Sequence, residues 1–302
     1  MSASRLRESD QSVKRTRNAG RALVACLVSA LLTACINPPE TRPTVRAPSP
    51  GASNPELESY YRSGIYGATD TFRSGPRCQI YYPVNMNYGR HPILIWGNAT
   101  RTSTFSYQDL FHHWATYGVV VVAAATSDAG DGRHMRDCLE HILNLNGGQV
   151  LRGRNPFRGR LNPNRIAAAG HGEGGGGALM LGRDMRITTT IALQPYVRGL
   201  GHSPLASANQ SGPILLMSGT GDTLASPQTN QQVVFDDANV PVTWLTLHGA
   251  NQQAPLYHGG AYRGPMTAWI RWKLWGDDKA ARVFEGDECL LCRDEMWTIQ
   301  TK

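Results

Sequence analysis

The stretch Gly170–Gly174 has the spacing of a catalytic turn but lacks its nucleophile. Residues 165–180 read RIAAAGHGEGGGGALM, in which a small apolar run leads into glycines and then into a second apolar run. In the pattern G-x-S-x-G a strand turns sharply into a helix and presents a serine above the end of a sheet. Glycines at both ends of the pattern let the strand and helix approach closely. Here the serine position is Gly172, which has no hydroxyl.

The sequence around this turn alternates between strand and helix patterns. Short apolar runs rich in β-formers predict strands at 79–83, 92–96, 118–125, 165–169, 188–193, 213–218 and 241–246. Helix-like stretches lie between or after them at about 107–116, 133–145, 174–183, 228–237 and 266–275. This alternation favours an α/β fold, with a mostly parallel sheet flanked by helices on both faces.

The segment 147–164 interrupts the alternation. It reads GGQVLRGRNPFRGRLNPN and holds four arginines among Gly, Pro and Asn. We expect a solvated surface excursion, and a basic loop that binds a ligand is the alternative.

Length and charge exclude some classes of function. The chain has 302 residues, 41% hydrophobic and 18% charged, which suits one globular domain and an N-terminal extension. Of the net charge of +7, residues 1–34 contribute +4, because six Lys and Arg stand there against two acidic residues. The remainder is only +3, so we expect no nucleic-acid partner.

The N-terminal residues predict export and a lipid anchor. Residues 22–34 are 13 consecutive residues without charge behind a basic stretch, too short to span a bilayer and typical of a signal peptide. They end in Leu32-Thr33-Ala34-Cys35, which resembles the bacterial lipobox, so we expect a signal peptide at 1–34 and acylation of Cys35. An ordinary secretory signal with an incidental cysteine is the alternative. Ile36 after the cysteine favours the outer over the inner membrane of the cell envelope.

Behind the expected anchor lies a tether. Six prolines occur between residues 38 and 55, and such a stretch is extended rather than packed. We therefore expect a lipidated N-terminus and tether at 35–58 and the folded domain at 59–302.

Four cysteines remain in the predicted domain. An exported domain with four cysteines favours two disulfides, for which three connectivities are possible. The spacing of the last two resembles a C-x-x-C redox or metal motif, but a C-terminal disulfide is favoured because no second such motif accompanies it. The four are Cys78, Cys138, Cys289 and Cys292.

Dispersed motifs then point to a family. The chain resembles bacterial α/β-hydrolases of the dienelactone-hydrolase, chlorophyllase-like and polyester-hydrolase group, the last including cutinases and polyethylene terephthalate hydrolases. The resemblance covers roughly residues 60–297. Its motifs, besides the turn and the cysteines near the end, are Ile93–Asn98, His113–Ala115, Ser218–Thr223 and Gly259–Arg263.

This resemblance assigns roles to residues beyond the turn. Asp222, which follows the run 213–218, matches the catalytic acid, and Gln252 stands where the histidine of a Gly-Ala-x-His turn is expected. The other implied positions are Asn98 and Glu173 for the oxyanion hole, Tyr196 for an aromatic wall of the cleft, and His171 beside the missing serine.

Three functions remain open at this point. A glycine offers no nucleophile and a glutamine no base, so we expect an inactive hydrolase fold whose old ester cleft binds a small ester, a polymer or an envelope protein. The second is an active carboxylic ester or polyester hydrolase that uses another constellation, such as His248 or His171 with Asp222 and a water. The third is a structural envelope lipoprotein. No cofactor and no metal site are expected, since no HxH or HxxxH spacing is present.

Overall fold

A computed structural model describes residues 54–150, 155–199 and 201–302. This part of the chain contains a nine-stranded sheet in the order β1-β2-β4-β3-β5-β6-β7-β8-β9. The six strands from β4 to β8 in that order are parallel neighbours, whereas β2 is antiparallel to β4, β1 to β2 and β9 to β8. The strands are β1 Thr69–Ser74, β2 Cys78–Pro83, β3 His91–Gly97, β4 Val120–Ala124, β5 Leu161–His171, β6 Thr189–Leu193, β7 Ile214–Gly219, β8 Val242–Leu247 and β9 Trp297–Thr301.

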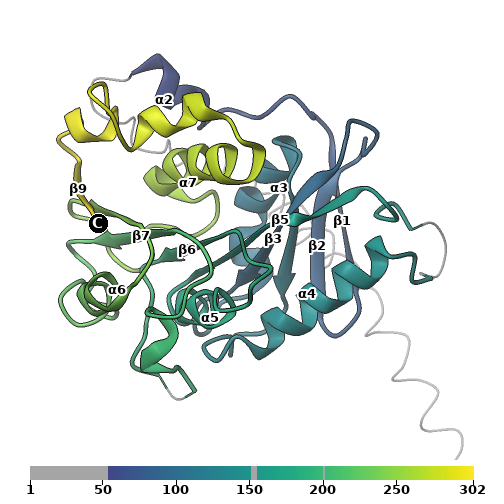
Figure 1. The fold of residues 1–302 in the computed structure, drawn as a ribbon, viewed down its shortest axis with the longest axis horizontal. Helices are drawn as coiled ribbons and strands as arrows, with labels where there is room; N and C mark the ends of the chain where they lie inside the picture. Colours follow the sequence, from purple (N-terminus) through teal and green to yellow (C-terminus); the bar gives the residue numbers. More distant parts are fainter. Residues whose placement is uncertain (1–53, 151–154, 200) are drawn as a thin grey trace, which may run out of the picture. The chain divides into compact units, whose positions relative to one another are not determined.

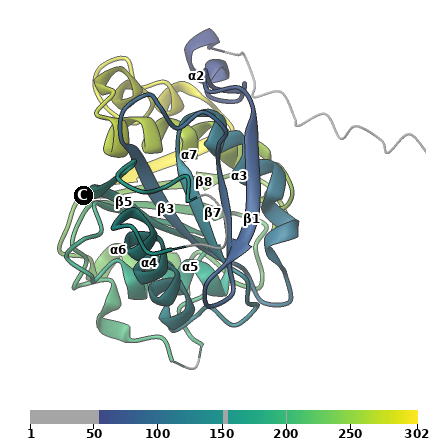
Figure 2. The same cartoon turned by 90° about the vertical axis from the view of Figure 1, so that its right-hand side faces the viewer.

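Helices cover both faces of this sheet (Figures 1 and 2). The α-helices are α2 Pro55–Ser59, α3 Gln108–Thr116, α4 Arg133–Asn146, α5 Glu173–Leu181, α6 Gln231–Asp237 and α7 Arg263–Ile270, and a π-helical turn, Arg271–Trp275, continues α7. Short 3-10 helices are Thr104–Tyr107, Pro204–Ala206, Gly260–Tyr262, Asp278–Val283 and Leu291–Arg293. The predicted α/β class, a mostly parallel sheet between helices, is confirmed.

The alternation along β3 shows how two cores form. Leu94 and Trp96 pack in the cluster that contains residues of α3 and α7, whereas Ile93 and Ile95 pack in the cluster that contains residues of α4. Every residue of β3 is buried. Such continuous apolar runs are typical of parallel strands covered on both faces.

The sheet is wider than the sequence predicts. β1 and β9 are edge strands that were not predicted, because their mostly polar residues are only partly buried and give no apolar run. β5 is also longer than the predicted 165–169, since it begins at Leu161.

Two predicted boundaries need correction. Leu57, in α2, is buried against the domain, so folded residues precede the predicted domain start at 59. Within 147–164, Phe157 and Leu161 are buried in the core, so this segment is not wholly a solvated excursion.

The predicted signal peptide, Cys35 and most of the tether lie outside the described residues. Among the helices described, none is long and apolar enough to cross a membrane.

Two disulfides join the four cysteines. Cys78–Cys138 connects β2 to α4, and Cys289–Cys292 closes a four-residue turn near the C-terminus. This is the predicted number of bridges, and it selects one of the three connectivities that the sequence leaves open.

Candidate functional site

The turn at Gly172 has the backbone geometry of a nucleophile elbow. β5 ends at His171 and α5 begins at Glu173, so Gly172 alone separates them, with φ 57° and ψ −121°. A side chain at this φ is strained, which is why the conformation marks functional turns. A Cβ on Gly170 would clash with the carbonyl oxygen of Gly174. The small residues of the motif therefore permit the close approach that the sequence predicts.

The space above Gly172 is occupied by the side chain of Gln252. A Cβ built on Gly172 would lie 2.8 Å from the terminal amide of Gln252 and 3.0 Å from Cβ of Ala99. Both distances are shorter than ordinary contacts between unbonded atoms. The glutamine thus fills the volume into which a serine side chain would project.

Gln252 reaches this position as part of a hydrogen-bonded chain of side chains. Its amide suits both neighbours when the oxygen accepts from Nε2–H of His171 at 3.2 Å and the nitrogen donates to Asp222, whose Oδ1 lies at 3.1 Å. His171 in turn accepts, at Nδ1, the hydroxyl proton of Tyr107 at 2.8 Å. The chain runs Tyr107–His171–Gln252–Asp222 and assigns the Nε2–H tautomer to the histidine.

Burial keeps His171 neutral. Its side chain is 1% exposed, and loss of hydration lowers its pKa from 6.5 to about 4, while hydrogen bonds to Gln194 and Gln252 act in the opposite direction. At neutral pH the ring is therefore uncharged. Its Nε2 proton is donated to Gln252 and its Nδ1 lone pair is taken by Tyr107, so the ring has no free site for a proton from a water.

Asp222 is fixed by the loop after β7. Its Oδ1 accepts from the backbone N–H groups of Leu224 and Ala225, both at 2.9 Å. Burial raises the pKa of this carboxyl group, and these two hydrogen bonds lower it in part. The carboxylate faces Gln252, which is the arrangement expected of the acid partner of a histidine at that position.

Asn98, in the loop after β3, and Glu173, at the start of α5, lie next to the elbow. Asn98 follows β3, and its buried side chain donates to the carbonyls of Ala124 and Thr126, both at 2.8 Å. Glu173 begins α5, and its carboxylate accepts from Thr100 at 2.6 Å. These bonds hold the loop after β3 against the start of the helix, where the resemblance puts the oxyanion hole.

Tyr196 is tied to the same turn through its backbone. Its N–H donates to the carbonyl of Gly172 at 2.8 Å, while its side chain is 38% exposed. Exposed apolar side chains also stand in the loops after β3, β7 and β8, namely Phe105, Leu224 and Tyr257. All four loops leave the carboxyl edge of the sheet, where Gly172, Asp222 and Gln252 meet.

Other histidines near this edge have separate partners. His248 bonds to Thr298 of β9 at 2.8 Å and is exposed, and His258 accepts from the N–H of Gly260 at 3.2 Å. Neither bonds to Asp222 or Gln252.

Tyr107, by contrast, belongs to the site but was not predicted, because nothing in its sequence surroundings connects it with His171. Within the described ranges, no group of three or more His, Cys, Asp or Glu could hold a metal ion.

Comparisons with known proteins agree with this geometry. A family model described as PETase, PET hydrolase-like, matches residues 41–287. Cutinase est2 of Thermobifida alba is 28% identical over 244 residues, which cover 76% of this chain and 75% of the relative. Cutinase cut1 of Thermobifida fusca is 26% identical over 276 residues, 86% of this chain and 79% of the relative. The predicted resemblance is confirmed, and this chain belongs to the PET hydrolase-like family of α/β-hydrolases.

Proposed function

We propose that this protein holds an apolar ester or polyester segment in the cleft around Gly172 without hydrolysing it. The observation that carries the proposal is the amide of Gln252, which fills the space of a serine side chain above Gly172. Acyl transfer needs a nucleophile with a base in hydrogen-bond reach. The glycine supplies no nucleophile, and an amide cannot take up a proton near neutral pH.

The loops around the elbow nevertheless offer a surface for an apolar ligand. Tyr196, Phe105, Leu224 and Tyr257 offer apolar surface on the loops around the elbow. Ligand sites in open α/β sheets lie at the carboxyl ends of the strands, where these loops stand. A chain of apolar groups separated by esters suits such a surface, because the contacts need no charge.

The internal hydrogen bonds of the site argue against hydrolysis by an activated water. A water acting as the nucleophile needs a free acceptor to take its proton. In the chain Tyr107–His171–Gln252–Asp222 both nitrogens of His171 are engaged, and burial lowers its pKa to about 4. His171 is thus a weak base with no vacant lone pair.

A lipid anchor would localise this binding function to the cell envelope. The lipobox-like Leu32–Cys35 and the proline-rich residues after it support a domain tethered to the cell envelope. We infer that the anchor keeps the bound ester or polymer near the cell surface, with the outer membrane as the expected site.

Hydrolysis and binding are to be measured on the same purified protein. We expect no turnover of p-nitrophenyl butyrate above a buffer blank, yet adsorption to a polyester film that Tyr196→Ala reduces. Met185→Ala, an exchange of an exposed apolar side chain on another part of the surface, is the matched control. Turnover by the wild type would favour an enzyme, and its loss in Asp222→Asn would assign the chemistry to this site. Equal adsorption of wild type and Tyr196→Ala would remove the support for binding in the cleft.

A further inference from the structure

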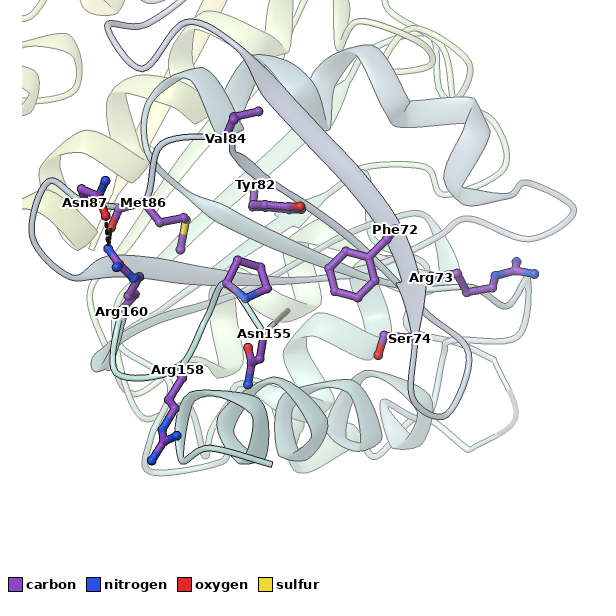
Figure 3. Close-up of a pocket in the computed structure, with 11 residues that line it drawn as sticks. Phe72, Arg73, Ser74, Tyr82, Val84, Met86, Asn87, Asn155, Arg158 and Arg160 are labelled. Carbon is purple, nitrogen blue, oxygen red and sulfur yellow. Dashed lines mark hydrogen bonds between the residues drawn. The ribbon is translucent and has the colours of Figure 1, made fainter. Parts of the chain in front are cut away.

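A cavity lies beside the β1–β2 hairpin at the edge of the sheet. Its volume is about 840 Å³, within the range of small-molecule sites. It lies between the β1–β2 hairpin and the arginine-containing residues that lead into β5 (Figure 3). None of the residues that line it belongs to the site at Gly172.

One wall of the cavity is apolar. Phe72 stacks on the buried ring of Phe157 with centroids 5.7 Å apart, and Tyr82 meets both rings edge-on. Met86 and the 58% exposed Val84 extend this wall. The packing against Phe157 holds the Phe72 ring in place, so the wall is already formed for a flat or extended apolar group.

The other feature of the cavity is a guanidinium group held in a fixed position. Nη1 of Arg160 donates to the carbonyl of Met86 at 3.0 Å and to Oδ1 of Asn87 at 2.5 Å. Figure 3 shows Arg160 beside Asn87 at one end of the cavity and Arg158 on the same side, whereas Arg73 extends away at the opposite end. Both bonds of Arg160 use one nitrogen, which leaves Nη2 and Nε as donors for a bidentate oxyanion.

The positive charge at this cavity is not neutralised by ion pairs. In the described part of the chain, Arg73, Arg158 and Arg160 form no salt bridge within 4.0 Å, although five other arginines do. The nearby carboxylate of Asp70 accepts the hydroxyl of Tyr82 at 2.9 Å and is not among the lining residues. The lining therefore combines an apolar wall with uncompensated cationic donors.

We propose that this cavity binds a small amphiphilic anion. Its oxyanion, a carboxylate or a phosphate, is held by Arg160, and its apolar body lies on Phe72, Tyr82 and Val84. The site is independent of the cleft at Gly172, and its ligand is recognised by charge, which the proposed cleft ligand does not require.

Isothermal titration calorimetry with chosen probes tests this site on the purified protein. We expect 4-butylbenzoate or 4-butylphenyl phosphate to bind, and the ratio of their affinities identifies the preferred oxyanion. The neutral 4-butylbenzyl alcohol and inorganic phosphate should each bind at least tenfold more weakly. An equal affinity for the alcohol would overturn the role of the arginines, and an equal affinity for inorganic phosphate the role of the apolar wall.

Two variants locate the binding. Arg160→Gln removes the anchoring charge, and Val84→Asp puts a carboxylate on the exposed part of the wall, so each should weaken binding of the better probe at least tenfold. Val84 is mostly exposed, so its exchange tests the site even if Arg160→Gln fails to fold. Arg183→Gln, an exposed arginine elsewhere, and Tyr196→Ala in the cleft are the controls. Loss of binding in Tyr196→Ala with no change in Val84→Asp would assign the probe to the cleft and overturn the proposal.

Discussion

The terminal amide of Gln252 lies 2.8 Å from the point where a Cβ on Gly172 would stand. The side chain of Gln252 thus occupies the space where a side chain at position 172 would stand. The absence of a side chain at one makes room for the side chain at the other. Substitutions at Gly172 and at Gln252 should therefore have coupled effects on activity and on stability.

Restoring the triad should need both positions together. Gly172→Ser alone meets the Gln252 amide and the strain of φ 57°, which costs about 1–3 kcal/mol, and its hydroxyl has no base. Gln252→His alone has no hydroxyl to activate. We expect the double variant to hydrolyse p-nitrophenyl butyrate faster than the sum of the single variants, since a triad acts as a unit.

Asp222→Asn in that double variant provides the control. It removes the carboxylate that would orient the new histidine, and most of the gained activity should disappear. A gain that persists without Asp222 would show that the geometry described for the site is not the source of the activity.

Tyr107→Phe should destabilise the fold through His171. The change leaves the buried Nδ1 of His171 without its donor, and an unsatisfied buried polar atom costs about 1–3 kcal/mol. Tyr82→Phe is the matched control, because the hydroxyl of Tyr82 bonds to Asp70 at the surface. Denaturant titration should give a clear loss for the first variant and a change within about 0.5 kcal/mol for the second. Equal losses would contradict the assigned hydrogen bond.

Acid should destabilise the protein partly through His171. Its pKa is about 4 in the folded state against 6.5 as the ordinary value, so the unfolded chain binds the additional proton between these pH values. The contribution of His171 to the free energy of unfolding is full above pH 6.5 and is lost as the pH falls toward 4. At pH 5 the loss from this one group is about 2 kcal/mol. His171→Gln should weaken the dependence of the unfolding free energy on pH. Identical slopes for wild type and variant between pH 6.5 and 5 would refute the assignment.

The two disulfides should differ in their effect on stability. The Cys78–Cys138 bridge spans 60 residues, and the loop-entropy relation gives about 4 kcal/mol for it, against about 2 kcal/mol for the Cys289–Cys292 bridge, which spans 3. The paired exchange Cys78→Ser with Cys138→Ser should therefore lower the melting temperature more than Cys289→Ser with Cys292→Ser. Alkylation without reductant should leave all four thiols of the wild type unmodified.

We expect a lipid anchor on Cys35, which a labelled fatty acid would reveal. Metabolic labelling with a radioactive fatty acid should mark the wild type in a bacterial host, and Cys35→Ala should lose the label and leave the membrane fraction. Cys26→Ala is the control, because this second cysteine lies inside the predicted signal peptide. A fatty-acid label on the Cys35→Ala protein would refute acylation at Cys35.

The central strands could be predicted because apolar composition alone marks them. β4, VVVAA, and β7, ILLMSG, are buried on both faces, and such runs are recognisable in one sequence. β1, TDTFRS, could not be predicted, since it is stabilised by pairing with β2 and not by its own apolar residues.

Within the site, motif spacing and the family resemblance pointed to Gly172, Asp222 and Gln252, which the structure brings together, but not to the hydrogen bonds between the side chains around them. That Gln252 bonds to both His171 and Asp222 depends on how the loop after β8 folds over the elbow. Tyr107 is 64 residues from His171 along the chain, and only the packing of the helical segments after β3 brings the two together. Contacts of this kind follow from tertiary structure, which no local pattern encodes.

The contact between Gly172 and Gln252 also bears on descent. A lineage that changed Gly172 to serine first would gain strain and a collision, and one that changed Gln252 to histidine first would lose the amide between Asp222 and His171. Under the proposed binding function neither step alone brings hydrolysis, so selection for hydrolysis has nothing to act on until both changes are present. We therefore expect descendants of this chain to change in what they bind sooner than they gain a complete triad.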